Sequence, residues 1–166
     1  SSIKTLHGCF ERVVIEHPNK TAITYAGNKI TYDMLNSRSN QIASYLVANG
    51  MRREDKVALL LDLSDESITL ILATLKAGGA YIPLDNSYSF TYLSGLLQQA
   101  NPKFIIVKDE ASKQLFDSLI IEGKNRLLTL SELSANILNI SGDNLNLPVE
   151  ANNLAYVIYT SATTGK

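Results

Sequence analysis

The sequence has a single cysteine, no surplus of charge and no long hydrophobic run. Cys9 cannot form a disulfide within the chain, and it lies in an apolar-periodic stretch, so we expect a buried, unreactive thiol and a reducing compartment. The 15 basic and 16 acidic residues give a formal net charge of -1, which leaves no basic stripe for nucleic acid and no polybasic tract for anionic lipid. No run approaches the roughly 18 apolar residues that span a bilayer, and the start, Ser-Ser-Ile-Lys, lacks the features of a signal peptide. These absences predict a cytoplasmic protein without nucleic-acid or membrane partners.

Side chains that could hold a metal are also few. His7 and His17 have no cysteine, aspartate or glutamate at metal-ligand spacing, so we expect them to be partly exposed helix residues. Asp65 and Glu66 fall in the first turn of an expected helix, where acidic residues favour the helix dipole without any catalytic role. We therefore predict no metal site and no pair of catalytic carboxylates in this chain.

What is present is enough apolar material for one core, since 45% of the residues are hydrophobic and the length suits a single domain. Thr21–Tyr25 and Lys29–Thr31 flank Gly27-Asn28, which predicts a hairpin. Apolar periodicity and capping residues predict further helices and strands. The expected helices begin near Leu6, after Thr31 and after Ser64, and run through about 91–99 and 112–119; the expected strands are 56–61, 81–84, 104–107, 127–130 and 154–159.

Strands that alternate with helices predict an α/β fold with a mostly parallel sheet and helices on both faces. The continuous apolar character of 56–61, 104–107 and 154–159 predicts that these are interior strands. The helix after Ser64 is apolar nearly all round, so we expect it to be buried. The Asn- and Ser-rich region 134–153 reads as loop. Sheets of this kind bind ligands at the carboxyl ends of their strands.

The residues after the last expected strand combine hydroxyls with a glycine. Thr160, Ser161, Thr163, Thr164 and Gly165 could wrap phosphate oxygens with hydroxyls and backbone N–H groups, although an ordinary Ser/Thr turn is an equally good reading of this stretch alone. It is not a Walker A loop, because no glycine stands five residues before Gly165.

Three stretches in order resemble the signatures of the adenylation domains of nonribosomal peptide synthetases, which belong to the adenylate-forming, AMP-binding enzymes. ITYDML at 30–35 is similar to their first signature, LKAGGAYIPLD at 75–85 to their second, and LAYVIYTSATTGK at 154–166 to the opening of their phosphate-loop signature. The entry segment with LHGCFERVV and HPNKTAI fits as well, so the resemblance covers essentially the whole chain.

The resemblance implies a function. Such enzymes join ATP to a carboxylate, often of an amino acid, release pyrophosphate, and pass the acyl group to the phosphopantetheine thiol of a carrier domain. It implies that the loop Thr160, Ser161, Ala162, Thr163, Thr164, Gly165 and Lys166 binds the ATP phosphates, with Mg²⁺ sharing the neutralisation of charge. It implies no catalytic side chain here: residues 1–166 correspond to the N-terminal part of the large subdomain, ending within this loop, and the fragment alone is expected to be inactive.

Three departures from the family pattern stand out. Ala162 occupies the place of the first loop glycine, where a Cβ could strain the backbone or hold phosphate away. Met34 stands where relatives carry a glutamate that completes a helix-capping box. Residues 86–91 lack the usual Pro and acidic-Arg pair, so no role is transferred to them. The paired glycines Gly78 and Gly79 have a structural reading, a tight turn from a helix into a strand.

Two other functions remain open at this point. A truncated or degenerate adenylation fragment could act as a docking or scaffold module, and Ala162 favours that alternative. A dinucleotide-binding domain is disfavoured, because no Gly-x-Gly-x-x-Gly follows the first strand. A sequence that continues after Lys166 with Pro-Lys-Gly would favour the enzyme.

Overall fold

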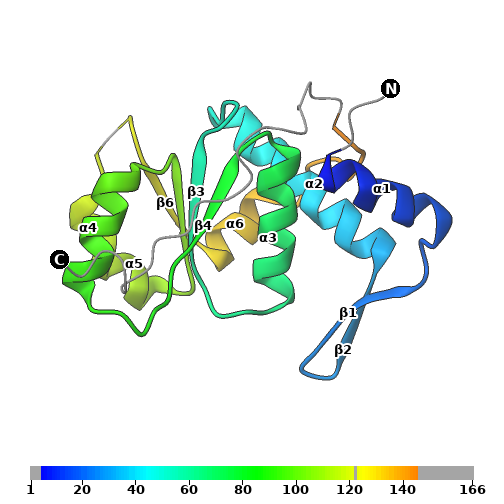
Figure 1. Ribbon diagram of the computed structural model, residues 1–166, viewed down its shortest axis with the longest axis horizontal. Coiled ribbons are helices and arrows are strands. Elements are labelled where there is room, and N and C mark those ends of the chain that lie inside the picture. The colour runs from blue at the N-terminus through cyan, green and yellow to red at the C-terminus, as the bar shows by residue number, and fades with distance from the viewer. Residues whose placement is uncertain (1–4, 122, 146–166) are drawn as a thin grey trace.

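The computed structural model describes residues 5–121 and 123–145 of the chain, and Figure 1 shows its elements around one open sheet. The sheet has four parallel strands in the order β4-β3-β5-β6. Their bounds are β3 Lys56–Leu60, β4 Ala80–Pro83, β5 Phe104–Val107 and β6 Arg126–Thr129. The predicted α/β fold with a parallel sheet is therefore confirmed, and β3 and β5 are interior strands as expected. The expected strand 154–159 lies outside the described residues.

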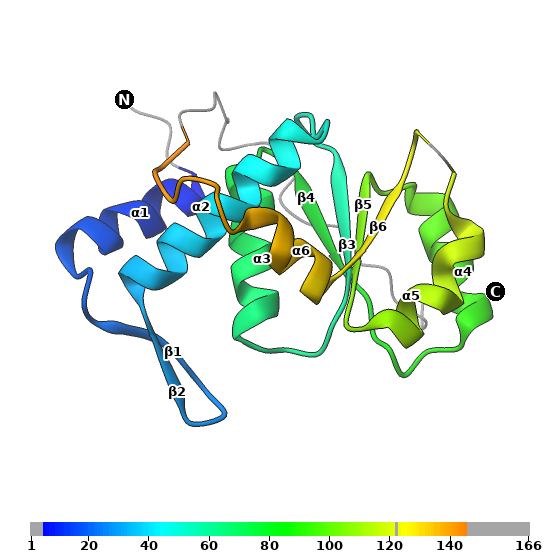
Figure 2. The ribbon, with the colours of Figure 1, turned by 180° about the vertical axis from the view of Figure 1, so that it is seen from behind.

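Helices cover both faces of the sheet. On one side α2 (Tyr32–Ala48), α3 (Asp65–Lys76) and α6 (Leu130–Ile137) pack on one set of strand side chains, and on the other α4 (Phe90–Ala100) and α5 (Glu110–Phe116) pack on the alternate set. Figures 1 and 2 show these two groups on opposite sides of the strands. Successive residues of a strand point to opposite faces, so an apolar strand feeds two cores. In β3, for example, Val57 and Leu59 belong to the first core and Ala58 and Leu60 to the second.

The order of the strands reverses direction once. From β3 the chain crosses through α3 to β4 on one side, and from β4 it returns through α4 past β3 to β5 and then through α5 to β6. Parallel crossovers are right-handed, so a reversal of direction moves the helices to the other face. The loops after β3 and β5 therefore leave toward opposite faces, which makes the carboxyl ends of these neighbouring strands the switch point of the sheet.

The first part of the chain lies beside this sheet. Helix α1 (Leu6–Glu16) is followed by the antiparallel hairpin of β1 (Thr21–Tyr25) and β2 (Asn28–Thr31), which projects from α1 and α2 in Figures 1 and 2. The hairpin prediction is thus confirmed. The expected buried thiol is wrong, since Cys9 is exposed. The reason is that α1 contacts the rest of the protein along a narrow face, and Val14 is the one residue of this helix that is buried.

Helix α3 is largely buried, as expected, but its two sides are covered unequally. Leu70, Ala73 and Thr74 are buried against the core. A second side, which we call the α3 outer face, is only half-buried and consists of Ile68, Ile71, Leu72 and Leu75, of which Ile71 also packs against the core. These positions recur at the spacing of one helix face.

The region expected to be loop contains a helix. Helix α6 (Leu130–Ile137) includes the first four residues of 134–153. Its start is fixed by a capping box, in which the side chains of Thr129 and Glu132 each accept a hydrogen bond from the other's backbone N–H group. A short 3-10 turn, η1 (Asp117–Leu119), continues α5. Among the described residues no helix is long and apolar enough to cross a membrane.

Candidate functional site

The predicted phosphate loop, Thr160 to Lys166, lies outside the described residues, so its geometry stays a prediction. The described residues do contain the other two signatures and the carboxyl edge of the sheet. The first signature opens α2 and the second closes α3, and these two helices lie side by side.

The glycines of the second signature form a turn without spare room. Gly78 has φ +83°, a conformation that favours glycine. A Cβ on Gly79 would overlap the Met51 Cε atom and lie 2.7 Å from the Asp55 carbonyl oxygen. The turn is closed by the Gly79 N–H, which donates to the Thr74 carbonyl at 3.0 Å. The structural reading of these two glycines is therefore confirmed.

The same signature places a charged side chain in the interior, which the sequence analysis missed. Lys76 is 2% exposed. Its ammonium donates to Asn36 Oδ1 at 2.6 Å, to Ser39 Oγ at 2.8 Å and to Asn40 Oδ1 at 2.8 Å, all on α2. The Phe10 ring of α1 covers it, with its centroid 5.2 Å from Nζ. Asn36, Ser39 and Asn40 have the spacing i, i+3 and i+4, which places three polar side chains on one face of α2. This pattern was the signal that could have revealed the site.

The amides that receive Lys76 bind a second segment with their nitrogens. Asn40 Nδ2 donates to the Gly142 carbonyl at 2.8 Å and to Asn144 Oδ1 at 2.8 Å, and Asn36 Nδ2 donates to Asn144 Oδ1 at 3.0 Å. Gln41 Nε2 reaches the Ile140 carbonyl at 2.9 Å. These bonds fasten residues 140–144 along α2. Residues 140–144 stand near the end of the described residues, before the predicted strand and loop.

Burial dominates the electrostatics of this cluster. It lowers the pKa of Lys76 to about 8, against the opposing attraction of the Glu11 carboxylate. Burial, together with the positive charge of Lys76, also lowers the pKa of His7. Three neutral oxygens at hydrogen-bond distance compensate the buried ammonium only in part, because they carry no formal charge.

The first signature caps α2 as expected. Thr31 Oγ1 accepts from the Met34 backbone N–H at 3.2 Å. Met34 cannot return the bond that a glutamate would make, and its side chain is 54% exposed.

The carboxyl edge of the sheet carries a cavity of about 300 Å³ at the switch point. Asp62 follows β3, Asn86 follows β4, and Lys108 and Asp109 follow β5. They line it together with Phe90, Leu93, Ser112, Leu115 and Phe116. The Asp109 carboxylate caps α5 by accepting from the Ser112 N–H at 2.9 Å, which lowers its pKa. The cavity thus has an apolar floor and a rim on which Asp62 and Lys108 carry opposite charges.

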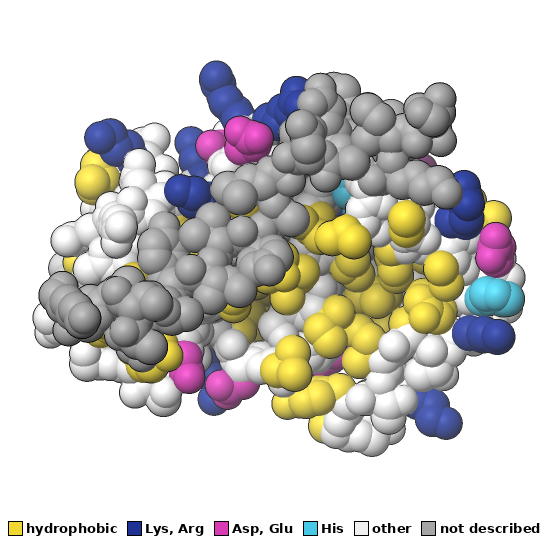
Figure 3. All heavy atoms as spheres, in the orientation of Figure 1, with side chains coloured by type: hydrophobic (Ala, Val, Ile, Leu, Met, Phe, Trp, Pro, Cys, Tyr) yellow, Lys and Arg dark blue, Asp and Glu magenta, His cyan; other side chains and the backbone are white. Residues whose placement is uncertain are grey.

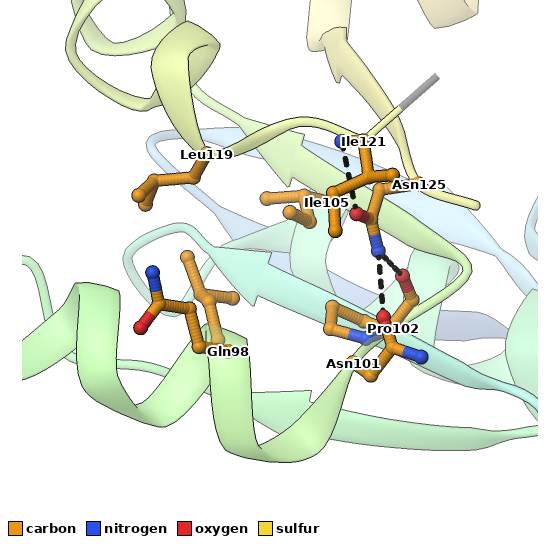
Figure 4. A pocket seen from close by; sticks show the side chains of 8 residues that line it. Gln98, Asn101, Pro102, Ile105, Leu119, Ile121 and Asn125 are labelled. Atoms are coloured by element: carbon orange, nitrogen blue, oxygen red, sulfur yellow. Dashed lines mark hydrogen bonds between the residues drawn. The ribbon is translucent and has the colours of Figure 1, made fainter. Parts of the chain in front are cut away.

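A second cavity, of about 270 Å³, lies at the amino ends of β5 and β6 and is drawn in Figure 4. Asn125 spans it: its Nδ2 donates to the Pro102 carbonyl at 2.7 Å and to Asn101 Oδ1 at 3.2 Å, and its Oδ1 accepts from the Ile121 N–H at 3.3 Å. Asn101 has φ +47° and ends α4 in the left-handed conformation that asparagine tolerates. The polar groups of Asn101, Pro102, Ile121 and Asn125 bond one another, so this cavity is a structural joint at the end of the sheet away from the switch point.

Comparisons with known proteins agree with the signatures. The family model described as AMP-binding enzyme matches residues 10–166. Tyrocidine synthase 1 of Brevibacillus parabrevis is 34% identical over 98% of this chain, which spans 14% of that protein. Surfactin synthase subunit 2 of Bacillus subtilis is 34% identical over 98% of this chain, which spans 4% of it.

Solved structures share the fold. The nonribosomal peptide synthetase FmoA3 superposes with a TM-score of 0.81 at 25% identity, over 97% of this chain and 16% of that one. MatB from Rhodopseudomonas palustris, solved bound to ATP, has a TM-score of 0.86 at 28% identity, over 99% of this chain and 34% of that one. The chain therefore belongs to the AMP-binding enzyme family and is related to the nonribosomal peptide synthetases.

Proposed function

We propose that this chain is the N-terminal part of an adenylation domain that activates a carboxylate, of an amino acid or a related acid, with ATP. The observation that carries the proposal is the family match over residues 10–166, which ends on the loop Thr160–Lys166 in the order that the three signatures require. The chain spans a small share of its relatives, so activity belongs to the longer protein.

In this proposal the loop holds the ATP phosphates and supplies no nucleophile. Hydroxyls of Thr160, Ser161, Thr163 and Thr164 and backbone N–H groups around Gly165 are suited to phosphate oxygens. Ala162 and Lys166 complete the loop, and Lys166 matches only a variable position of the signature. The substrate carboxylate attacks the α-phosphorus, the bond from that phosphorus to the bridging oxygen of pyrophosphate breaks, and pyrophosphate leaves. The loop contains no carboxylate, so we assign it to phosphate rather than to direct capture of a metal.

Mg²⁺, when bound with ATP, neutralises part of the triphosphate charge. The acyl group then passes to the phosphopantetheine thiol of a carrier domain. Partners of the chain are thus the rest of the adenylation domain, a carrier domain and a small carboxylate substrate. A cytoplasmic location stays a prediction from the sequence.

A substitution in the loop of the full-length protein tests the assignment. A methyl group at Ala162 should strain the loop or hold the phosphates away, so Ala162→Gly should tighten ATP about fivefold, which corresponds to about 1 kcal/mol. Isothermal titration measures it, and affinity for the carboxylate substrate alone is the internal control and should not change. Unaltered ATP affinity would mean that this position tolerates a Cβ.

The second candidate function is a scaffold or docking module that has lost nucleotide binding. Ala162 in place of glycine is the observation that favours it. Failure of the full-length protein to bind ATP, both with Ala162 and with the Gly variant, would support the scaffold and contradict the enzyme.

A further inference from the structure

The Lys76 ammonium has all three of its hydrogens engaged by α2. Asn36 Oδ1, Ser39 Oγ and Asn40 Oδ1 lie 2.6, 2.8 and 2.8 Å from Nζ. An ammonium donates three hydrogen bonds and accepts none, whereas a neutral amine donates two and accepts one. The protonated form therefore uses all three acceptors, whereas the neutral form keeps all three contacts only if the Ser39 hydroxyl turns and donates to the amine.

The charge on Lys76 also sets the direction of two amides. Because Asn36 and Asn40 present their oxygens to the ammonium, their nitrogens must point the other way. Those nitrogens donate to Asn144 Oδ1 at 3.0 and 2.8 Å, and Asn40 also donates to the Gly142 carbonyl at 2.8 Å. The segment is seated closely, since a Cβ on Gly142 would lie 3.3 Å from the Ser37 Cα atom. The lysine thus reaches residues 140–144 through two side-chain amides.

Few other charges surround this lysine. Within the described residues, His7 and Glu11 of α1 are the titratable groups that interact with it electrostatically. The α2 side chains in contact are two amides and a hydroxyl, and the groups of residues 140–144 that join the network are the Asn144 amide and backbone carbonyls. The described part of the chain contains no ion pair that would hold the proton on Lys76.

We propose that Lys76 is a protonation-controlled latch that fastens residues 140–144 onto helix α2. With the proton present, the ammonium fixes both asparagines and attracts the Phe10 ring of α1, 5.2 Å away. When the proton leaves to solvent, one hydrogen-bond donor becomes an acceptor. An asparagine can then turn its nitrogen toward the amine and withdraw it from Asn144 or Gly142, and the attraction to Phe10 is lost.

The working range of the latch follows from burial. The pKa of Lys76 is lowered to about 8, so the change falls above neutral pH and well below the range of an exposed lysine, about 10.4. The fold as a whole need not weaken there. Between these two values the unfolded chain binds the extra proton, so the lysine's contribution to the free energy of unfolding rises with pH while the hold on residues 140–144 is released.

An NMR titration of the 166-residue chain from pH 6.5 to 10.5 tests the latch. We expect the Lys76 Cε signal and the side-chain carbonyl carbons of Asn36 and Asn40 to titrate together with a midpoint near 8, and the backbone amides of Gly142 and Asn144 to shift with them. Lys76→Met should abolish the transition at the asparagines. Lys124→Met, which removes an exposed lysine, should leave it unchanged.

The wild-type titration decides the matter even where Lys76→Met fails to fold. A Lys76 midpoint above 10 would overturn the latch. So would a midpoint near 8 without any change at the asparagine carbons and at Gly142, since Ser39 would then absorb the change and nothing would be released.

Discussion

At the scale of single residues, Gly79 shows how closely the second signature packs. A Cβ there would meet Met51 Cε and the Asp55 carbonyl oxygen, and the backbone atom cannot move aside cheaply. We expect Gly79→Ala to lower the free energy of unfolding by about 1–3 kcal/mol, as overpacking does. The matched control is Gly95→Ala at an exposed position of α4, where nothing lies within 4 Å and alanine should stabilise the helix by up to about 1 kcal/mol. Equal effects of the two substitutions, measured by urea unfolding, would contradict this packing.

Glu132 is one residue that links the stability of the fold to acid. Lys113 Nζ lies 2.7 Å from its carboxylate and lowers its pKa. A carboxylate with a lowered pKa adds stability at neutral pH, and this contribution is lost as the pH falls from about 4.3, the unfolded value, through the folded pKa. Glu132→Gln should therefore lower the free energy of unfolding at pH 7, by less than about 1 kcal/mol because the pair is partly exposed, and should flatten its decline between pH 5 and 3.

The control for this pH effect is Glu16→Gln, an exposed carboxylate at the end of α1. It should leave the acid limb of the stability curve as it is. An acid limb of the same slope in wild type and Glu132→Gln would contradict the pairing of Glu132 with Lys113.

At the scale of elements, the sequence predicted those that periodicity and caps define. Strands β3 and β5 were expected from continuous apolar runs, and α2 from Thr31 and the break at Gly50, which has φ +94°. Helix α6 was missed because its first residues follow β6 without a break and the Asn- and Ser-rich composition beyond it reads as loop. The capping box at Thr129 and Glu132 was the local signal that outweighed that composition.

The buried lysine shows why sites are harder to predict than elements. Lys76 is the last residue of α3 and stands before Ala77 and two glycines, which looks like an ordinary helix end with a basic last turn. Its burial arises from α1 and α2, which are far from it in sequence, and no local pattern around Lys76 reports those contacts. The loop Thr160–Lys166, by contrast, was identified by its composition and resemblance, and its geometry stays a prediction.

At the scale of the whole molecule, hydrophobic side chains gather over the side formed by α3, α1 and the hairpin, as Figure 3 shows. The α3 outer face, Ile68, Ile71, Leu72 and Leu75, belongs to this side and is only half-buried. Large exposed apolar patches mark contact surfaces. We infer that the rest of the adenylation domain covers it, so the 166-residue chain alone should self-associate in a concentration-dependent manner.

Sedimentation velocity measures this association. The double variant Ile71→Glu, Leu75→Glu should remain monomeric where the wild type associates, because charges replace the apolar contact. Leu115→Glu, at a side chain 60% exposed on α5 across the sheet, is the control and should associate like wild type. Monomeric wild type at high concentration would contradict the inference.

The most direct test of the proposed adenylation function is amino-acid-dependent exchange of radiolabelled pyrophosphate into ATP. We expect exchange by the full-length protein with one or a few amino acids or related acids. This exchange should fall strongly when Thr163 and Thr164 are both replaced by valine. The 166-residue chain alone should show no exchange. Exchange by the full-length protein that is unaffected by these loop substitutions would contradict the assignment of the ATP phosphates to Thr160–Lys166. Clear exchange by the isolated chain would contradict the expectation that the fragment alone is inactive.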